Sequence, residues 1–398
     1  MDLPTFHRLL SPAGQAVLQS AEELQPSETD FLTHFTRLSR QYPPELARTA
    51  LEVAILRREA AAKFPFARHL YLTREAMQQA SAHAVSTYRC QRLRPFNRLA
   101  DLACSVGGDT LALARMAPTL GVDLDGLRLA MARANLEALG LAERASFSQA
   151  DLQQALPLAP GTDLALFFDP ARRAQGRRVY SVRAYQPPLA VIQAWLPRFP
   201  ALAVKISPGV RLEEILPYDA EVEFISLHGE LKEAVLWFGP LKTASRRATL
   251  LPGAHSLVAP TGAPPELALH EPQAYLYEPD PAVLRAGLVT SLGQALGAAQ
   301  LDADIAYLTS DQPLESPFAR RWTVEAWFPF QLKRLREALR QRRVGHVVVK
   351  KRGSPLQPEA LIHDLRLSGD QQRVVFLTHL RGRPIVILAY PPQTNPVG

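Results

Sequence analysis

The N-terminal part of the chain carries its apolar residues at helical spacing. In "TDFLTHFTRLSRQ" and "ELARTALEVAILRREAAAKF" they recur at i, i+3, i+4 and i+7, which places them on one face of a helix. Ser27 and Thr29 are candidate caps for the first of these helices. The pattern predicts an all-helical domain over residues 1–93.

A different pattern follows, in which short apolar runs alternate with helical stretches. Strands that alternate with helices form crossover units and a largely parallel sheet with both faces covered. The pattern therefore predicts a doubly wound α/β domain over residues 94–242. The expected strands are "NRLADLAC", "TLGVDL", "ASFSQAD", "DLALFFDP", "ALAVKISPG" and "VEFISLHG".

Two further segments differ again in texture. Proline and glycine are dense in "LLPGAHSLVAPTGAPPELALHEPQAYLYEPDP", which predicts a connector or an embellishment over residues 243–318. The last part alternates strand, helix, strand and helix before two final strands. It predicts a compact α+β module over residues 319–398.

Composition narrows the class of protein. Of the 398 residues, 47% are hydrophobic and 21% are charged, which is typical of a folded, soluble chain. Cys90 and Cys104 are too few for a disulfide framework or a four-cysteine zinc site, so we expect a reducing, cytoplasmic location. The N-terminus lacks the pattern of a signal peptide, and no run reaches the ~18 apolar residues of a membrane span. We therefore expect no membrane partner.

The strongest chemical signal lies in "LADLACSVGGDTLALARMA". An apolar strand ends near Asp101 and runs through a loop of small residues, 103–108, into a helix that begins near Asp109. A doubly wound sheet holds cofactors at such a point, because small residues let the ligand approach the backbone and the helix offers free N–H groups. Asp123 ends the second strand, where an acid can accept hydrogen bonds from ribose hydroxyls. Asp151 follows the third strand, where an acid can contact an adenine amino group.

Two nucleotide-bearing cofactors compete for this layout. A nicotinamide dinucleotide would place its pyrophosphate over the helix N-terminus, where Asp109 would repel it. S-adenosyl-L-methionine carries no phosphate, and we favour it.

The sequences of two motifs also favour S-adenosyl-L-methionine. The stretches "DLACSVGGDT" and "GVDLDGLRLAMARAN" resemble motifs I and II of class I methyltransferases, which have a Rossmann-like sheet. Within that group the chain is most similar to the trimethylguanosine synthase-like enzymes, and more closely to a bacterial methyltransferase family that ends in a THUMP-like domain. The likeness spans almost the whole chain, including "KFPFARHLYLTREAMQQAS", "DPARR", "VKISPG" and the tail. The resemblance implies an α/β methyltransferase core between an N-terminal helical domain and a C-terminal α+β THUMP-like domain.

The resemblance also implies how the cofactor would be held. The first loop would line the methionine end, and the ends of the second and third strands would hold the ribose and the adenine. The residues are Asp101, Ala103, Ser105, Gly107 and Gly108 for methionine, Asp123 and Leu124 for ribose, and Asp151 and Leu152 for adenine. Ala103 and Ser105 stand where the family has glycine, so the close approach of the methionine moiety is less assured.

We expect no metal in this chemistry. Methyl transfer depends on positioning and electrostatics rather than on a metal ion. The scattered histidines, such as His228, His346 and His363, also lack the paired spacing of metal ligands.

The end of the fourth strand carries the acceptor chemistry. There "FFDPARR" begins like the [D/N]-P-P-[F/Y/W] motif of base N-methyltransferases, in which the acid and a carbonyl hold an exocyclic amine. Asp169 and Pro170 match this beginning and are the expected catalytic residues, whereas Ala171 and Arg172 do not match its end. A stretch of arginines follows and either forms a solvated loop or, as we favour, clamps phosphate beside the acceptor. These residues are Arg172, Arg173, Arg177 and Arg178.

A second constellation points to a different acceptor. Ribose 2′-O-methyltransferases resemble one another in a Lys-Asp-Lys-Glu set, and Lys63, Asp169, Lys205 and Glu233 occur here in that order. A lysine can act as the base that deprotonates a hydroxyl. Lys205 is therefore a third catalytic candidate, and both a base amine, such as guanine N2, and a ribose hydroxyl stay open as acceptors.

The C-terminal module indicates an RNA partner. Residues 320–352 hold eleven basic residues against two acids, interleaved with aromatic residues, whereas the whole chain carries a net charge of +7. A concentrated basic face is the electrostatic footprint of nucleic-acid binding, although a solvated basic helix face would look the same. The candidate contacts are Lys333, Arg336, Lys350, Lys351 and Arg352.

Three hypotheses about function follow. The first is an S-adenosylmethionine-dependent methyltransferase that acts on RNA. The second is a methyltransferase for a small molecule or a protein. The third is a non-catalytic RNA-binding protein with a degenerate cofactor site, for which Ser105 is the strongest argument.

Overall fold

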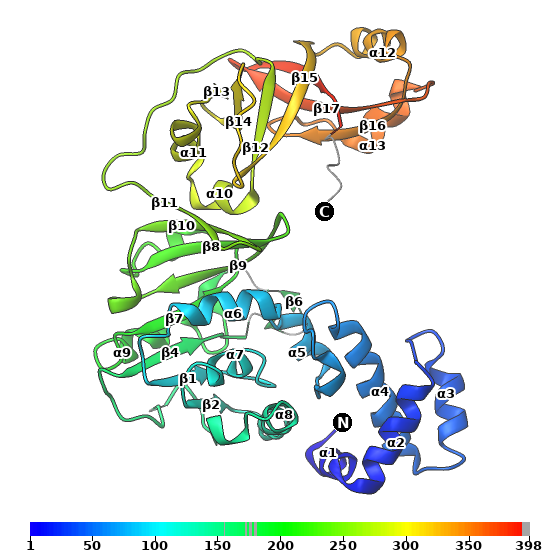
Figure 1. Ribbon diagram of the computed structural model, residues 1–398, viewed down its shortest axis with the longest axis vertical. Helices are drawn as coiled ribbons and strands as arrows, with labels where there is room; N and C mark the ends of the chain where they lie inside the picture. Colours follow the sequence, from blue (N-terminus) through cyan, green and yellow to red (C-terminus); the bar gives the residue numbers. More distant parts are fainter. Residues whose placement is uncertain (155, 172, 175–176, 179–180, 392–398) are drawn as a thin grey trace. The chain divides into compact units, whose positions relative to one another are not determined.

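The computed structural model describes residues 1–154, 156–171, 173–174, 177–178 and 181–391 (Figure 1). The chain forms two compact units, the first from residues 1–222 and 232–243, the second from residues 223–231 and from residue 244 onward. It passes between them within strands β8 (Glu221–Leu227) and β9 (Glu230–Trp237). Over the described ranges, no helix has both the length and the apolar character needed to cross a bilayer.

The first unit begins with a run of helices, which confirms the predicted helical leader. Three of these helices start at polar caps, where the side chains of Asp2, Ser11 and Thr73 each accept a main-chain N–H of the following turn. The helices are α1 (Leu3–Leu10), α2 (Pro12–Glu23), α3 (Phe31–Leu38), α4 (Pro44–Ala60), the 3-10 turn η1 (Ala67–His69), α5 (Arg74–Gln79) and α6 (His83–Gln91).

The helical leader and the α/β segment share one hydrophobic core. Leu51 of α4 is fully buried in a cluster that also contains Val106 from the loop after β1 (Arg98–Leu102) and Met131 and Leu136 of α8 (Gly126–Ala138). The predicted boundary at residue 93 therefore separates two kinds of secondary structure but not two cores.

The α/β segment of the first unit forms the predicted sheet. Its strands lie in the order β9-β7-β4-β1-β2-β3, parallel from β7 to β3, with β9 antiparallel at the edge of this unit. All residues of β4 and β7 are buried, as expected for strands covered on both faces. The strands are β1 (Arg98–Leu102), β2 (Thr119–Asp123), β3 (Ala145–Gln149), β4 (Leu164–Phe168) and β7 (Leu202–Ile206), and a separate pair is formed by β5 (Arg173–Ala174) and β6 (Arg177–Arg178).

Helices and short turns connect these strands. They are α7 (Thr110–Ala114), α8 (Gly126–Ala138), η2 (Ala142–Arg144), η3 (Val182–Ala184), η4 (Leu189–Val191), α9 (Ile192–Trp195), η5 (Leu212–Glu214) and η6 (Gly239–Leu241).

The second unit contains strands in the segment that the sequence predicts as a connector. Residues 243–318 supply β10 (Arg246–Leu251) and β11 (His255–Val258), and also three strands of a seven-stranded sheet, β12 (Tyr275–Pro279), β13 (Ala299–Asp302) and β14 (Ile305–Ser310). The prolines and glycines mark the ends of short elements. Pro281 starts helix α10 (Pro281–Ala286), and Gly287 and Gly297 end α10 and α11 (Val289–Leu296) with φ of 66° and 69°.

The C-terminal residues complete the seven-stranded sheet, in the order β13-β14-β12-β15-β18-β17-β16. One buried cluster contains Trp322 and Phe376, and another packs Leu335 and Leu361 of helices α12 and α13 against the sheet. The predicted alternation of strands and helices is confirmed. The elements are β15 (Ala319–Pro329), α12 (Leu332–Gln341), β16 (Val344–Lys351), α13 (Pro358–Leu365), β17 (Gln371–Leu380) and β18 (Arg383–Ala389).

Candidate active site

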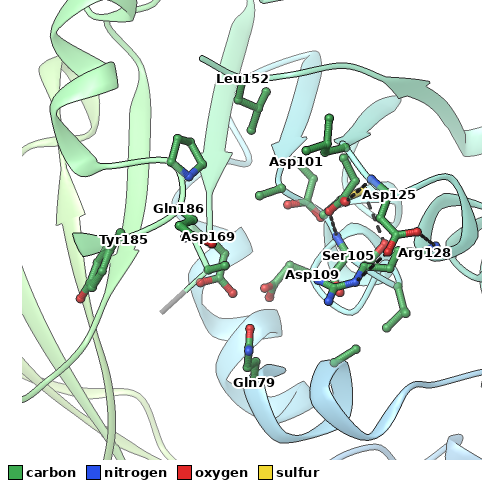
Figure 2. Close-up of a pocket in the computed structure, with 18 of the residues that line it drawn as sticks. Gln79, Asp101, Ser105, Asp109, Asp125, Arg128, Leu152, Asp169, Tyr185 and Gln186 are labelled. Atoms are coloured by element: carbon green, nitrogen blue, oxygen red, sulfur yellow. Dashed lines mark hydrogen bonds and ion pairs between the residues drawn. The ribbon is translucent and has the colours of Figure 1, made fainter. Parts of the chain in front are cut away.

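The carboxyl ends of β1, β2 and β4 open into a cavity of about 900 Å³ in the first unit. The loop after β3, helix α5 and residues 184–188 complete its walls. Figure 2 shows Asp101, Asp109 and Asp169 around this common space. This is the edge of the sheet at which the sequence places both the cofactor and the acceptor.

The loop after β1 adopts left-handed backbone conformations at two residues that are not glycine. Ala103 and Ser105 have φ of 60° and 50°, in the left-handed region that L residues adopt only at a cost of about 1–2 kcal/mol. The Ser105 N–H donates to Asp123 Oδ2 at 2.8 Å, and the Cys104 N–H donates to the Val122 carbonyl at 3.0 Å. These contacts with β2 hold the loop in its strained shape.

Gly107 has a packing role that the motif did not predict. It does not line the cavity, whereas Gly108 does. A Cβ on Gly107 would lie 3.1 Å from Ala132 Cβ and 3.3 Å from Leu136 Cδ1 of α8. Gly107 therefore permits the close approach of the loop to this helix.

Asp101 carries an unsatisfied acceptor at the wall of the cavity. Its Oδ2 accepts a hydrogen bond of 2.5 Å from Thr110 Oγ1, whereas its buried Oδ1 has no hydrogen-bond partner within the described part of the chain. Burial raises the pKa of Asp101 well above its ordinary value, and the negative charge of Asp109 raises it further. A ligand that brings a cationic donor to Oδ1 would satisfy both the orphaned oxygen and the buried charge. Ser105 Oγ is a second buried polar atom without a partner among the described residues.

The end of β2 presents acids whose hydrogen bonds are already organised. Asp123 accepts from the main-chain N–H groups of Ser105 and Asp125, at 2.8 Å and 2.9 Å. Asp125 caps α8, and Arg128 of α8 donates at 2.9 Å to Glu75 of helix α5. This ion pair ties the helical leader to the sheet at the wall of the cavity.

The apolar and polar residues expected around the nucleoside also line the cavity. Leu124 has 67% of its surface exposed and lies beside Asp123, whereas Leu152 is buried. Asp151 accepts from the N–H of Gln153 at 2.9 Å. Every predicted cofactor residue except Gly107 thus lines this one space.

Asp169 lies on the acceptor side and is paired with a buried lysine. Its Oδ2 lies 2.6 Å from Lys205 Nζ, which also donates to the Gln79 carbonyl at 3.2 Å. Lys205 is 1% exposed, so the Asp169 carboxylate carries the accessible end of the pair. Pro170 is buried, and Ala171 rather than Pro170 lines the cavity.

A wall that the sequence did not predict faces Asp169. Ala171 and Gln186 exchange two main-chain hydrogen bonds of 3.0 Å, which place Tyr185, Gln186 and Pro187 at the cavity. The Tyr185 hydroxyl accepts from the Ser207 N–H at 2.9 Å, which fixes the ring. Gln79 of α5 lines the cavity as well (Figure 2). The compact sequence "YQPP" after the fourth strand was the one available signal for this wall.

Arg89, Asp109 and Glu233 form a buried ionic network next to the cavity, to which Asp109 belongs. The guanidinium of Arg89 in α6 bridges the carboxylates of Asp109 and Glu233 and lies 4.5 Å from the ring centroid of Phe167. Burial opposes ionisation of Asp109, but Arg89 and then Lys205 outweigh it and hold the pKa of Asp109 below its ordinary value. Asp109 therefore stays ionised, which supports the prediction that it would repel a pyrophosphate.

The four residues of the ribose hypothesis, Lys63, Asp169, Lys205 and Glu233, have ion-pair and hydrogen-bond partners in three separate places. Asp169 and Lys205 form an ion pair. Lys63 Nζ donates to the carbonyls of Met77, Gln78 and Ala80, at the end of α5. Glu233 accepts from Arg89 and from Ser81 Oγ.

Most of the charged side chains that line the cavity are acidic. Seven carboxylates line it, from Glu75, Asp101, Asp109, Asp123, Asp125, Asp151 and Asp169, and Arg128 is the one cationic side chain among its described lining residues. Such a surface favours a cationic ligand and disfavours a polyanionic one. No cluster of three or more metal-binding side chains occurs among the described residues.

The expected phosphate contacts do not all lie in this unit. Arg172 lies outside the described residues, and the side chains of Arg173 and Arg177 in the β5–β6 pair are likewise not described. The basic candidates of the tail belong to the second unit. There Arg336 donates to the Asp364 carbonyl, Lys351 to the Leu356 carbonyl and Lys350 to Glu278, while Lys333 lies in the first turn of α12.

Comparisons with known proteins agree with this geometry. Residues 319–391 match the THUMP domain-like family, and residues 2–60 match a domain of unknown function, DUF8688. Two Mycobacterium tuberculosis proteins, from strains CDC 1551 / Oshkosh and ATCC 25618 / H37Rv, are each 36% identical over 345 residues, covering 83% of this chain and 92% of the relative. Both are named uncharacterized S-adenosylmethionine-dependent methyltransferases.

A solved structure shows the same fold. It is a protein of Porphyromonas gingivalis W83 described as a methyltransferase, with a TM-score of 0.73 and 22% identity, covering 95% of this chain and 98% of its own. The site and the relatives together identify the chain as a member of a family of S-adenosylmethionine-dependent methyltransferases, with S-adenosyl-L-methionine as its cofactor.

Proposed function

We propose that this enzyme methylates RNA, with an exocyclic amino group of a base, such as guanine N2, as the acceptor. The observation that carries the proposal is the Asp169–Lys205 pair, which presents a carboxylate in the same cavity as the orphaned Asp101 Oδ1. One end of the cavity then suits a cationic cofactor, and the other suits an amine.

The residues present fit S-adenosylmethionine. Asp101 Oδ1 would accept from the ammonium of the methionine moiety, and Asp123 would accept from the ribose hydroxyls. Leu124 would lie beside the ribose, and Asp151 and Leu152 would contact the adenine. When bound, the cofactor supplies an electrophilic methyl group on a sulfonium, and the acidic lining complements its positive charge.

Asp169 would orient the acceptor. Its carboxylate is positioned to accept an N–H of an exocyclic amine, which directs the nitrogen toward the methyl donor. The Gln186 and Gln79 amides line the same cavity and add hydrogen-bonding capacity. Lys205 acts as a positioning residue, because it holds the Asp169 carboxylate in place.

The same contacts favour the amine over the ribose hydroxyl. A base that deprotonates a hydroxyl needs a free lone pair. Lys205 Nζ instead donates to Asp169 Oδ2 and to the Gln79 carbonyl. We therefore keep the ribose reaction as the second candidate, in which Lys205 would have to lose a proton and leave this pair.

The second unit supports RNA as the substrate. Its THUMP-like part holds the densest basic stretch of the chain, and α12 exposes Lys333, Arg340 and Arg343 on or beside one short helix. The acidic catalytic cavity by itself disfavours phosphate, so grip on the RNA backbone has to come from other surfaces.

Labelled-methyl transfer tests the proposal. Total RNA from a cell that lacks this gene is incubated with the enzyme and labelled S-adenosylmethionine, and the nucleosides are then separated. We expect label in a base-methylated nucleoside. Label in a 2′-O-methylated nucleoside would favour the ribose reaction, and transfer to small molecules or proteins alone would refute the RNA substrate.

Two variants assign the roles. Asp169→Asn is expected to abolish transfer while the dissociation constant of S-adenosylmethionine stays within about threefold. Asp123→Ala is expected to weaken cofactor binding itself. If the unaltered protein failed to bind S-adenosylmethionine at equilibrium, the proposed catalytic site would be refuted.

A further inference from the structure

A second cavity, of about 640 Å³, lies wholly within the second unit. This volume falls in the range of about 300–1,000 Å³ that is typical of small-molecule sites. The turn between β8 and β9, the turn from β10 to β11, the end of β12 and the start of α10 form one part of its wall. Residues 317–320 and the end of β16 with Arg352 form the rest. No residue of the methyltransferase cavity takes part in it.

Two cations converge on one aromatic ring at this cavity. The Arg320 guanidinium carbon lies 4.5 Å and Lys350 Nζ 5.0 Å from the ring centroid of Trp322, which is 3% exposed. Strand register places Arg320 opposite Glu278, whose Oε2 lies 2.6 Å from Lys350 Nζ. The buried ring and one carboxylate thus hold two like charges together, at the cost of their mutual repulsion.

Arg352, a third cationic residue, and two histidines also line the cavity. The guanidinium of Arg352 lies 4.6 Å from the ring centroid of Tyr307 and donates through one nitrogen to the Ala306 carbonyl. His228 and His255 line the cavity and are exposed. Donors from separate strands and turns therefore surround one space.

The two acidic residues in the described lining of the cavity, Glu278 and Asp280, already form ion pairs or hydrogen bonds within the protein. Glu278 binds Lys350, whereas Asp280 Oδ1 accepts from Ser226 Oγ at 2.7 Å and from the Ala282 N–H at 2.8 Å. An anion in the cavity would relieve the repulsion between Arg320, Lys350 and Arg352. Leucine and proline side chains, among them Leu250, Leu284 and Pro317, add an apolar wall beside these charges.

We propose that this cavity binds the phosphate of a nucleotide, with the base against the apolar wall. The proposal extends the RNA substrate named above to a second site, but it requires neither the cofactor nor methyl transfer. The phosphate and base have two possible sources, a free mononucleotide or a nucleotide unit of RNA, and competition distinguishes them.

Isothermal titration calorimetry on the full chain tests the site, with adenosine monophosphate, adenosine and inorganic phosphate as probes. We expect adenosine monophosphate to bind at least about tenfold more tightly than adenosine, since a charged hydrogen-bonded pair contributes about that factor or more. Arg320→Gln and Arg352→Gln should each weaken the nucleotide about tenfold. Arg383→Gln, an exposed arginine outside the cavity in the same unit, is the matched control.

The outcomes separate cleanly. Loss of binding in the cavity variants but not in the control supports the site, and competition by a short RNA assigns the nucleotide to RNA rather than to a free metabolite. Phosphate-independent binding, no binding by the unaltered protein, or equal affinity in Arg320→Gln and the control would overturn the proposal. Because cofactor binding and methyl transfer are measured separately, failure of this site leaves the catalytic proposal intact, and the reverse also holds.

Discussion

Asp169 and Lys205 form an ion pair of 2.6 Å at the carboxyl ends of two neighbouring parallel strands, β4 and β7. The lysine is buried and the carboxylate reaches the cavity, so the charge that neutralises Asp169 comes from inside the sheet. This arrangement leaves the carboxylate accessible from the cavity while fixing its direction.

Replacement of Lys205 should therefore disable transfer without disabling cofactor binding. We expect Lys205→Met to lower kcat by about 10²-fold, the scale on which a positioned group contributes to catalysis. The dissociation constant of S-adenosylmethionine should change little. Lys205→Arg, which keeps the charge, should recover part of the rate, whereas a purely structural role would lower kcat and weaken cofactor binding together. Full activity of Lys205→Met would contradict the assignment.

Removal of the strain at Ala103 should stabilise the protein. The left-handed backbone costs alanine about 1–2 kcal/mol, whereas glycine adopts it freely and loses about 0.5–1 kcal/mol through its greater freedom in the unfolded chain. Ala103→Gly should thus raise the free energy of unfolding by about 0.5–1 kcal/mol in urea titration. Ala100→Gly, in the extended strand β1, is the control and should lower it. A loss of stability in Ala103→Gly would contradict the left-handed conformation.

The buried Asp101 predicts opposite effects of pH on stability and on cofactor binding. Its pKa is raised in the folded state, so the folded protein retains a proton that the unfolded chain has released. Stability from this group is present at low pH and is lost as the pH rises from the unfolded pKa, about 4, toward the raised folded value. Binding of a cationic cofactor requires the ionised carboxylate, so its affinity should increase over the same rise in pH.

Asp101→Asn separates the two effects. At neutral pH it should raise the free energy of unfolding of the cofactor-free protein, because no charge is buried, and it should weaken S-adenosylmethionine binding. Urea titrations and calorimetry across pH test both. The affinity of the variant should no longer depend on pH through this group. An unchanged pH profile in Asp101→Asn would assign the dependence to another residue.

Loss of Arg89 should destabilise the first unit strongly. Arg89→Met would leave Asp109 and Glu233 buried without their shared cation, which typically costs about 3–5 kcal/mol. Arg94→Met, an exposed arginine after the same helix, is the matched control and should change the free energy of unfolding by less than about 0.5 kcal/mol. Denaturant unfolding measures both. Equal stability of the two variants would show that the network contributes little.

Local patterns were sufficient for much of the fold and of the cofactor site. Alternation of apolar runs with helical stretches predicted the parallel strands of the first unit and the strands of the C-terminal module, because burial of a strand or of one helix face requires those periods. The edge strand β9 was not among the expected strands. The acids Asp101, Asp123 and Asp151 follow successive parallel strands, and such strands end at one edge of a sheet. The segment 243–318, expected as a connector or an embellishment, contains strands and helices that its pattern did not predict, because proline and glycine also mark the ends of short elements.

The sequence by itself thus predicted four of the acids that line the cavity, Asp101, Asp123, Asp151 and Asp169, since each one lies at or just beyond the end of its own strand. Only the tertiary structure decided the left-handed course of the loop at Ala103 and Ser105, which hydrogen bonds to a neighbouring strand hold in place. It also decided the wall around Tyr185 and the partner of Lys205. These contacts join residues far apart in the chain, and their geometry depends on strand register and burial, which no local spacing encodes.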